Sequence, residues 1–144
     1  MEEVVIITDI FQIKVYPRTS IDNSRRVRQL AHVLQGEIAL SCGKRIARYM
    51  PQAVGSWLLG VYDNDKTVSR AAQASFKLVF PSEEKYNGVL KIYQSYIVKF
   101  GRNVIEHETP NTLSDERTTS PDDANTKYYR TLGAIILAVT RLIG

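Results

Sequence analysis

Hydrophobic residues recur every three or four positions along most of the chain, which is the spacing of amphipathic α-helices. From residue 23 to about residue 41 this spacing predicts a helix that buries its apolar positions, which are Val27, Leu30, Ala31, Leu34 and Ile38. The same arrangement places three polar side chains on the opposite, exposed face, namely Arg25, Gln29 and His32. His32 is therefore predicted to be a surface residue.

A second helix is predicted from residue 64 to about residue 79, with the apolar face Val68, Ala71, Ala72, Ser75 and Val79. Its exposed stripe is largely basic and consists of Lys66, Arg70, Gln73 and Lys77. The two helical segments repeat one another after 41 residues without a gap, because Asp22-Asn23 aligns with Asp63-Asn64 and Val27 aligns with Val68. Repeats of roughly 40 to 47 residues are typical of HEAT and armadillo proteins.

The fold class predicted from this repeat is all-α, a HEAT/armadillo-like helical repeat that forms a fragment of an α-solenoid. Residues 1–144 are predicted to form a single domain, continued by further repeats. Residues 3–15 fit either a strand or a buried helix. A helix is predicted because the rest of the chain is predicted to be helical. Residues 44–50 predict a short basic helix, and Trp57 is expected in the core of the helix that follows.

Ser82 is a helix-capping residue, and a long helix is predicted from it to about Glu106. Its aromatic face is expected to pack against other helices and consists of Tyr86, Tyr93, Tyr96 and Phe100. Residues 109–120 are predicted to be a loop, which is long for a connection between helices. The final helix, from residue 121 to about residue 143, becomes apolar on nearly every side after Leu132, so it is expected to need neighbours on both faces.

Composition narrows the cellular setting. The chain has 144 residues, of which 44% are hydrophobic, and this is enough for one domain with a sizeable core. Its longest apolar run, residues 133–140, is shorter than the ~18 to 20 residues that span a bilayer. The first residues lack the pattern of a secretory signal, and the single cysteine, Cys42, can form no internal disulfide. A cytosolic protein is expected.

The net charge of +4 is concentrated in the first part of the chain. Residues 1–80 hold eleven Lys and Arg against seven Asp and Glu, whereas residues 81–144 hold eight of each. A basic surface of this kind suits a polyanionic partner. A solvated surface with a modest excess of charge explains the same numbers, so both interpretations stay open.

The sequence contains only fragments of the motifs that mark known catalytic sites. Glu106-His107-Glu108 is not a zinc-protease motif because Asn111 stands where the second histidine is needed, and Cys42-Gly43-Lys44-Arg45 lacks the glycine and the hydroxyl residue of a phosphate-binding loop. No Gly-x-Ser-x-Gly elbow is present. Asp122-Asp123 is explained by helix capping, while Asp115-Glu116 is either a recognition site or solvated loop charge. Neither enzymatic activity nor a cofactor or metal is predicted for these residues.

Three stretches resemble a known family, and they run from about Arg25 to Arg130. DNSRRVRQLAHVL, the segment from GKRIARYM to FPSEEK and above all ETPNTLSDERTTSPDDANTKYYR are similar to the N-terminal domain of listerin, a RING-type E3 ubiquitin ligase. The first eighteen residues contribute little to the resemblance. The resemblance implies a fold of antiparallel helix pairs. It also implies a cytosolic, ribosome-associated protein that docks on large ribosomal subunits obstructed by a stalled nascent chain. It also implies a companion factor that adds carboxy-terminal tails to the nascent chain, and a catalytic RING domain outside these residues.

Two hypotheses for binding follow. In the first, basic residues meet rRNA or ribosomal protein, and the candidates are Arg25, Arg28, Lys44, Arg45 and Arg48. The loop at 112–120 would add specificity through Thr112, Ser114, Asp115, Glu116 and Arg117. In the second, the chain is a helical-repeat scaffold that binds protein without touching nucleic acid. Neither hypothesis involves a membrane or a small-molecule substrate.

Overall fold

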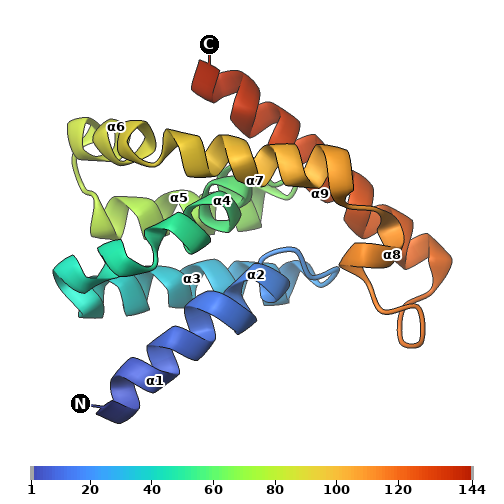
Figure 1. Cartoon of the computed structure of the whole chain (residues 1–144), viewed down its shortest axis with the longest axis horizontal. Helices are drawn as coiled ribbons and strands as arrows, with labels where there is room; N and C mark the ends of the chain where they lie inside the picture. Colours follow the sequence, from blue (N-terminus) through green and yellow to red (C-terminus); the bar gives the residue numbers. More distant parts are fainter. Residues whose placement is uncertain (1, 144) are drawn as a thin grey trace.

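The computed structural model describes residues 2–143, and within this range the chain forms helices and the turns that join them. The all-α prediction is confirmed. Met1 and Gly144, which the single-domain prediction includes, lie outside the described residues. The elements, drawn in Figure 1, are α1 (Glu2–Ile10), the π-helix η1 (Phe11–Val15), α2 (Tyr16–Thr19), α3 (Arg25–Cys42), the 3-10 helix η2 (Gly43–Arg48), α4 (Met50–Val61), α5 (Lys66–Val79), α6 (Glu83–Ile92), α7 (Gln94–His107), α8 (Pro110–Leu113) and α9 (Pro121–Ile143).

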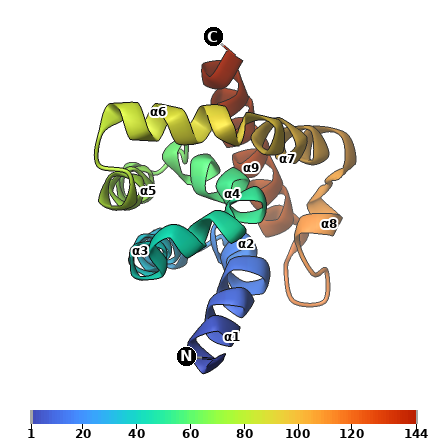
Figure 2. The same cartoon turned by 60° about the vertical axis from the view of Figure 1, so that its left-hand side comes forward.

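Helix α4 lies at the centre of the molecule, where it packs against α5, α7 and α9. Its residues from Ala53 to Gly60 are all buried. The two repeated helices, α3 and α5, lie side by side, and α9 runs against α7 (Figures 1 and 2). Successive helices pack against each other at α3 and α4, α4 and α5, and α6 and α7, as in a HEAT-like repeat, and the assignment to that repeat type stays a prediction.

Trp57 is fully buried in α4, as predicted. Its ring stacks on that of Phe76 with 4.3 Å between ring centroids, and its indole N–H donates a hydrogen bond of 2.7 Å to Ser75 Oγ. Both partners belong to α5. This one side chain therefore joins the two helices through apolar and polar contacts together.

The sequence repeat produces the same local structure twice. Oδ1 of Asp22 accepts the N–H of Ser24 at 2.8 Å, and Oδ1 of Asp63 accepts the N–H of Asp65 at 2.9 Å. Ser24 then caps α3 as Asp65 caps α5, each accepting a backbone N–H at the start of its helix. The repeat is thus a turn and a helix cap that start α3 and α5 in the same way.

The two repeated helices approach closely at Gly36. A Cβ atom at this position would lie 2.8 Å from Cβ of Ser75, which is closer than such atoms can come. Glycine on α3 facing serine on α5 therefore allows the two backbones to approach.

The predicted buried face of α3 is wrong in part. Ala31 is buried, but Leu30 and Leu34 are about half exposed, while three polar side chains lie inside, namely Arg28, His32 and Gln35. Arg28 and Gln35 are paired through their polar groups and His32 through Nδ1, which offsets much of the cost of burying them. Gln35 and Gln12 exchange two amide hydrogen bonds, of 2.7 and 3.0 Å, across the contact between α3 and η1. Hydrophobic spacing alone could not predict this, because the partners come from distant parts of the chain.

Other elements differ in detail from the prediction. Residues 3–15 are helical, but a π-helical turn over 11–15 precedes Pro17, whose ring excludes the carbonyl of Ile13 from its usual place in an α-helix. The predicted helix over 83–106 is interrupted at Tyr93, where α6 ends and α7 begins. Ser82 caps α6 as predicted. Three of the four aromatic side chains contact the core, whereas Tyr96 is exposed.

Two further corrections concern short segments. The predicted loop at 109–120 contains the short helix α8, which begins at Pro110 behind a capping box formed by Thr109 and Thr112. The short basic helix after Gly43 is a 3-10 helix that ends at Arg48. Neither a single helical turn nor a 3-10 helix carries enough periodicity to be recognised from sequence.

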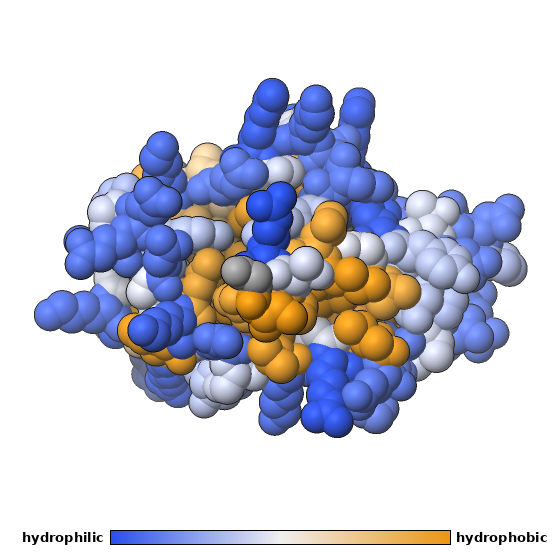
Figure 3. Space-filling model, turned by 90° about the horizontal axis from the view of Figure 1, so that it is seen from above, coloured by the Kyte–Doolittle hydropathy of each residue, from blue (hydrophilic) through white to orange (hydrophobic). Residues whose placement is uncertain are grey.

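Apolar side chains remain on the surface where α6, α7 and the C-terminal half of α9 meet. Figure 3 looks onto this side from above and shows an apolar patch surrounded by hydrophilic side chains. The exposed large apolar residues of these helices include Ile92, Ile136, Leu137 and Ile143. None of the helices between residues 2 and 143 has the length and hydropathy to cross a membrane.

Candidate functional site

The predicted basic residues do not form one cluster. Lys44, Arg45 and Arg48 are exposed on η2, beyond the C-terminal end of α3. Arg25 is exposed at the other end of α3, about 27 Å away along an 18-residue helix. The structure therefore divides the predicted basic surface into two regions.

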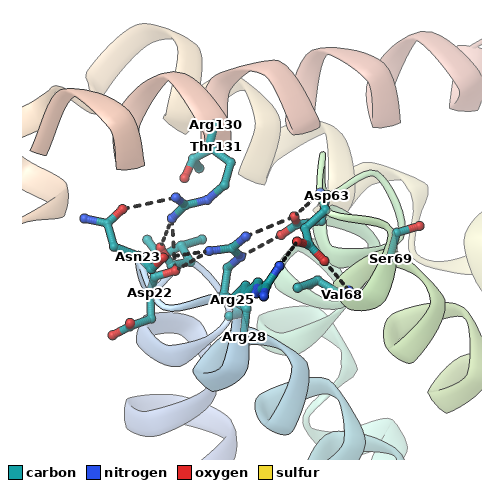
Figure 4. Close-up of polar contacts among 12 residues, drawn as sticks. Asp22, Asn23, Arg25, Arg28, Asp63, Val68, Ser69, Arg130 and Thr131 are labelled. Carbon is teal, nitrogen blue, oxygen red and sulfur yellow. Dashed lines mark hydrogen bonds and ion pairs between the residues drawn. The ribbon is translucent and has the colours of Figure 1, made fainter. Parts of the chain in front are cut away.

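Arg28, the fifth of these residues, lies inside the protein and is only 4% exposed. Its guanidinium donates to both carboxylate oxygens of Asp63, at 2.9 and 3.3 Å. It also donates to the backbone carbonyls of Asp22 and Asn23, at 2.9 and 3.2 Å (Figure 4). The prediction that Arg28 contacts a partner is corrected, because this side chain joins the two repeated turns instead.

Arg130 extends the same polar network to α9, and it was not among the residues predicted from the sequence. Its guanidinium lies above the turn before α3 (Figure 4), donating to Asn23 Oδ1 at 3.1 Å and to the carbonyls of Ile21 and Asp22. Burial, and then the charge of Arg28, lower the pKa of Arg130 to about 10. The repeat pattern contained a signal for Asp63, whereas nothing in the local sequence marks Arg130.

His32 is fully buried, so the prediction of a surface residue is wrong. Nδ1 lies 2.8 Å from the hydroxyl of Tyr16, while Nε2 has no hydrogen-bond partner among residues 2–143. The ring fills the space beside Gly60, where a Cβ atom would lie 2.3 Å from it. Burial lowers the pKa of His32 to about 4, with Asp63 opposing and Arg28 adding to the shift. His32 is therefore neutral at physiological pH.

Acid should destabilise the domain through His32. Between pH 6.5 and about 4 the unfolded chain binds a proton on this residue and the folded chain does not. The free energy of unfolding should then fall as the pH falls through this window, by at most ~3 kcal/mol. Urea unfolding at pH 7 and pH 4.5 measures the loss. His32→Gln, which introduces the residue found at the aligned position 73, should lose much less.

His107 supplies the matched control, because it is the only other histidine and its side chain is 69% exposed. His107→Gln should keep the pH dependence of the unmodified protein. Equal pH dependence in the two variants would contradict the role given to His32.

The loop residues predicted to provide specificity lie in and after α8. Thr112 forms the capping box with Thr109, and its hydroxyl donates a hydrogen bond to Glu108. Ser114 directly follows the last residue of α8. Arg117 pairs with Asp115 at 3.1 Å and lowers the pKa of that carboxyl. Glu116 is exposed and forms no contact of this kind among the described residues. Asp115 and Arg117 offset each other, so the loop presents little net charge apart from Glu116.

The basic stripe predicted on α5 is confirmed. Its residues, which are Lys66, Arg70, Gln73 and Lys77, are all exposed. Arg25 lies near the start of this stripe, because its guanidinium is 3.8 Å from the carboxylate of Asp65, the residue before α5. One of the two basic regions is thus formed by Arg25 and the α5 stripe, and the other by η2.

The fold places this chain among the stacked-helix domains, and the sequence comparisons define its family. E3 ubiquitin-protein ligase listerin, N-terminal domain, is the family that matches, and it does so over residues 2–144. The chain belongs to this family of listerin N-terminal domains.

Relatives from several organisms agree. The chain is 41% identical over 130 residues to the E3 ubiquitin-protein ligase listerin of Neurospora crassa, covering 90% of this chain and 8% of that protein. It is 28% identical over 137 residues to listerin of Gallus gallus, covering 90% of this chain and 7% of that protein. For Saccharomyces cerevisiae listerin the identity is 22% over 138 residues, covering 93% and 9%. The chain thus spans less than a tenth of the length of these relatives.

Proposed function

We propose that this domain docks a listerin-type E3 ubiquitin ligase on large ribosomal subunits obstructed by a stalled nascent chain. The full protein would be a cytosolic RING-type ligase acting in ribosome-associated quality control, with its catalytic domain outside these residues. Its partners would be the subunit and the factor that adds carboxy-terminal tails to the nascent chain. Membership of the listerin family supports the ligase, and the surface charge supports the docking.

The observation that carries the docking proposal is the outward position of the basic side chains. Lys44, Arg45 and Arg48 point their charges to solvent, as does the α5 stripe, and among the described residues none of these side chains forms an ion pair. Free Lys and Arg side chains displace counterions from a phosphate backbone, and this gives affinity that depends on salt but little on sequence. Ribosomal RNA is recognised in large part through its shape and its phosphates.

Reversing the charge of η2 should weaken binding to the ribosome. We expect the triple variant Lys44→Glu, Arg45→Glu, Arg48→Glu to lose roughly tenfold or more in affinity, since three attractive contacts become repulsive. Co-sedimentation of the domain with purified large subunits that carry a stalled nascent chain measures this. In the unmodified protein, retention should fall steeply between about 50 and 200 mM salt.

A second triple variant controls for net charge. Lys85→Glu, Lys91→Glu, Lys99→Glu changes the charge by the same amount on α6 and α7, where all three side chains are exposed. It should bind nearly as well as the unmodified domain. Equal losses in the two variants would contradict the assignment of the surface, and retention that is insensitive to salt would favour the protein-binding scaffold.

A further inference from the structure

A groove opens between α1 and the C-terminal end of α3, with η2 along its side. Its volume is about 490 Å³, within the ~300 to 1,000 Å³ of typical ligand sites. Aliphatic side chains from both walls form its apolar floor, including Val4 and Ile7 from α1 and Ile38 from α3. Val4 and Ile7 are 58% and 65% exposed, so both contribute apolar surface to the groove that the other described residues leave uncovered.

The direction of α1 creates this groove. The helix projects away from the rest of the molecule in both views of Figures 1 and 2. Within α1 only Thr8 is buried, and a hydrogen bond from the Tyr49 hydroxyl to Asp9 ties the helix to the segment after η2. One wall of the groove is therefore a helix that is tied to the rest of the protein at few points.

The rim of the groove is basic. Lys44, Arg45 and Arg48 line it together with a single acidic residue, Glu37. An occupant must therefore bring apolar groups for the floor and negative charge for the rim. RNA offers the charge but no aliphatic side chains, so the floor favours a protein segment.

The walls of the groove also limit the backbone of the occupant. They are helices, whose backbone N–H and C=O groups already bind one another, so an extended peptide would find few partners for its own backbone. A helical segment satisfies its backbone internally and can lay an apolar stripe into the groove.

We propose that this groove binds an amphipathic helix of a partner protein, with an aliphatic stripe on the floor and acidic side chains against Lys44, Arg45 and Arg48. This adds to the proposed function, on which it rests only for where the partner is met. The η2 side chains that the proposed function assigns to the subunit would then meet carboxylates of a protein there, and the α5 stripe would be the basic region that meets the phosphates of its rRNA.

Cys42 provides a direct test, because it is the only cysteine of the chain, it is partly exposed and it lines the groove. The probe is a synthetic helical peptide of about 18 residues, since shorter isolated helices are marginal in water. It carries leucines on one face and glutamates beside them. At about ten times its dissociation constant the probe should slow alkylation of Cys42 by an uncharged maleimide about tenfold. A peptide with lysine in place of glutamate should bind at least about tenfold more weakly.

Two neighbouring residues of α1 give matched variants. Ile7 lines the groove and is 65% exposed, whereas Ile6 is 50% exposed and does not line it. Because both side chains are on the surface, neither Ile7→Asp nor Ile6→Asp should unfold the domain. Ile7→Asp should weaken binding of the acidic probe about tenfold and reduce the protection of Cys42 at the same probe concentration to about twofold, while Ile6→Asp should leave both unchanged.

Several results would overturn the proposal: equal effects of Ile6→Asp and Ile7→Asp, equal affinity for the acidic and lysine peptides, or no protection of Cys42. Single-stranded RNA that protects Cys42 and displaces the peptide would make this a nucleic-acid site. A dimer of the domain dispersed by Ile7→Asp would assign the groove to a second copy. A domain that binds the peptide but not the ribosomal subunit would reject only the proposed function. A domain that binds the subunit but not the peptide would reject only the groove proposal.

Discussion

Asp63→Ala should destabilise the domain by about 3 to 5 kcal/mol. The substitution removes the carboxylate and leaves the guanidinium of Arg28 in a site where its side chain is only 5% exposed. The two backbone carbonyls that Arg28 also binds cannot neutralise it. The same carboxylate shapes the turn before α5 by accepting the N–H of Asp65. Urea unfolding followed by circular dichroism measures the loss as a lower midpoint.

Two variants separate the buried charge from the turn. Arg28→Met together with Asp63→Leu removes both charges, and it should recover much of the stability that Asp63→Ala loses, because replacing a buried ion pair by apolar residues is often nearly neutral. Asp65→Ala removes the helix cap of α5 and a long ion pair with the exposed Arg25, and it should cost much less than Asp63→Ala. An Asp63→Ala protein no less stable than Asp65→Ala would show that the ion pair has little energetic weight.

Trp57→Ala should cost a similar amount, about 3 to 5 kcal/mol. The change removes a fully buried ring, its stacking on Phe76 and the hydrogen bond to Ser75, and leaves a cavity between α4 and α5. The neighbouring helices can close such a cavity only in part, so the lost contacts are not replaced. Thermal and urea unfolding by far-ultraviolet circular dichroism are suitable measurements because neither depends on tryptophan emission.

Trp57→Phe is the graded comparison. It keeps an aromatic ring against Phe76 but loses part of the volume and the indole N–H. Ser75 Oγ still donates to the carbonyl of Ala72, so its hydroxyl is not left without a partner. We therefore expect Trp57→Phe to cost clearly less than Trp57→Ala. If the alanine variant lost under about 1 kcal/mol, α4 would not be the centre of the core.

Local signals in the sequence predicted much of the secondary structure. Ser82 predicted the start of α6, and the helix predicted from residue 121 begins there as α9, where Ser120 accepts the N–H of Asp123; both starts were predictable because capping depends on neighbours in the chain. The repeated turns were also visible, since Asp22 and Asp63 act on backbone groups two residues away. Strong periodicity likewise predicted the exposed stripe of α5.

The buried side of α3 depends on distant residues, and this is why it was missed. Gln12, Tyr16 and Asp63 supply partners for Gln35, His32 and Arg28, which turns a polar stripe inward. Helical spacing cannot distinguish this stripe from an exposed one. The candidate site was predictable to the same extent: the exposure of Lys44, Arg45 and Arg48 fits their local sequence, whereas the burial of Arg28 and the groove beside η2 arise from packing.

Helix α1 is attached to the core by far fewer contacts than α4, and this difference affects motion as well as shape. Segments with little buried surface open locally at a small fraction of the free energy of global unfolding. Amide hydrogens of residues 2–10 should accordingly exchange with solvent much faster than those of α4. Helix α1, which forms one wall of the groove, can then change its angle when a partner binds. The same groove can therefore accept helices whose side chains differ in size.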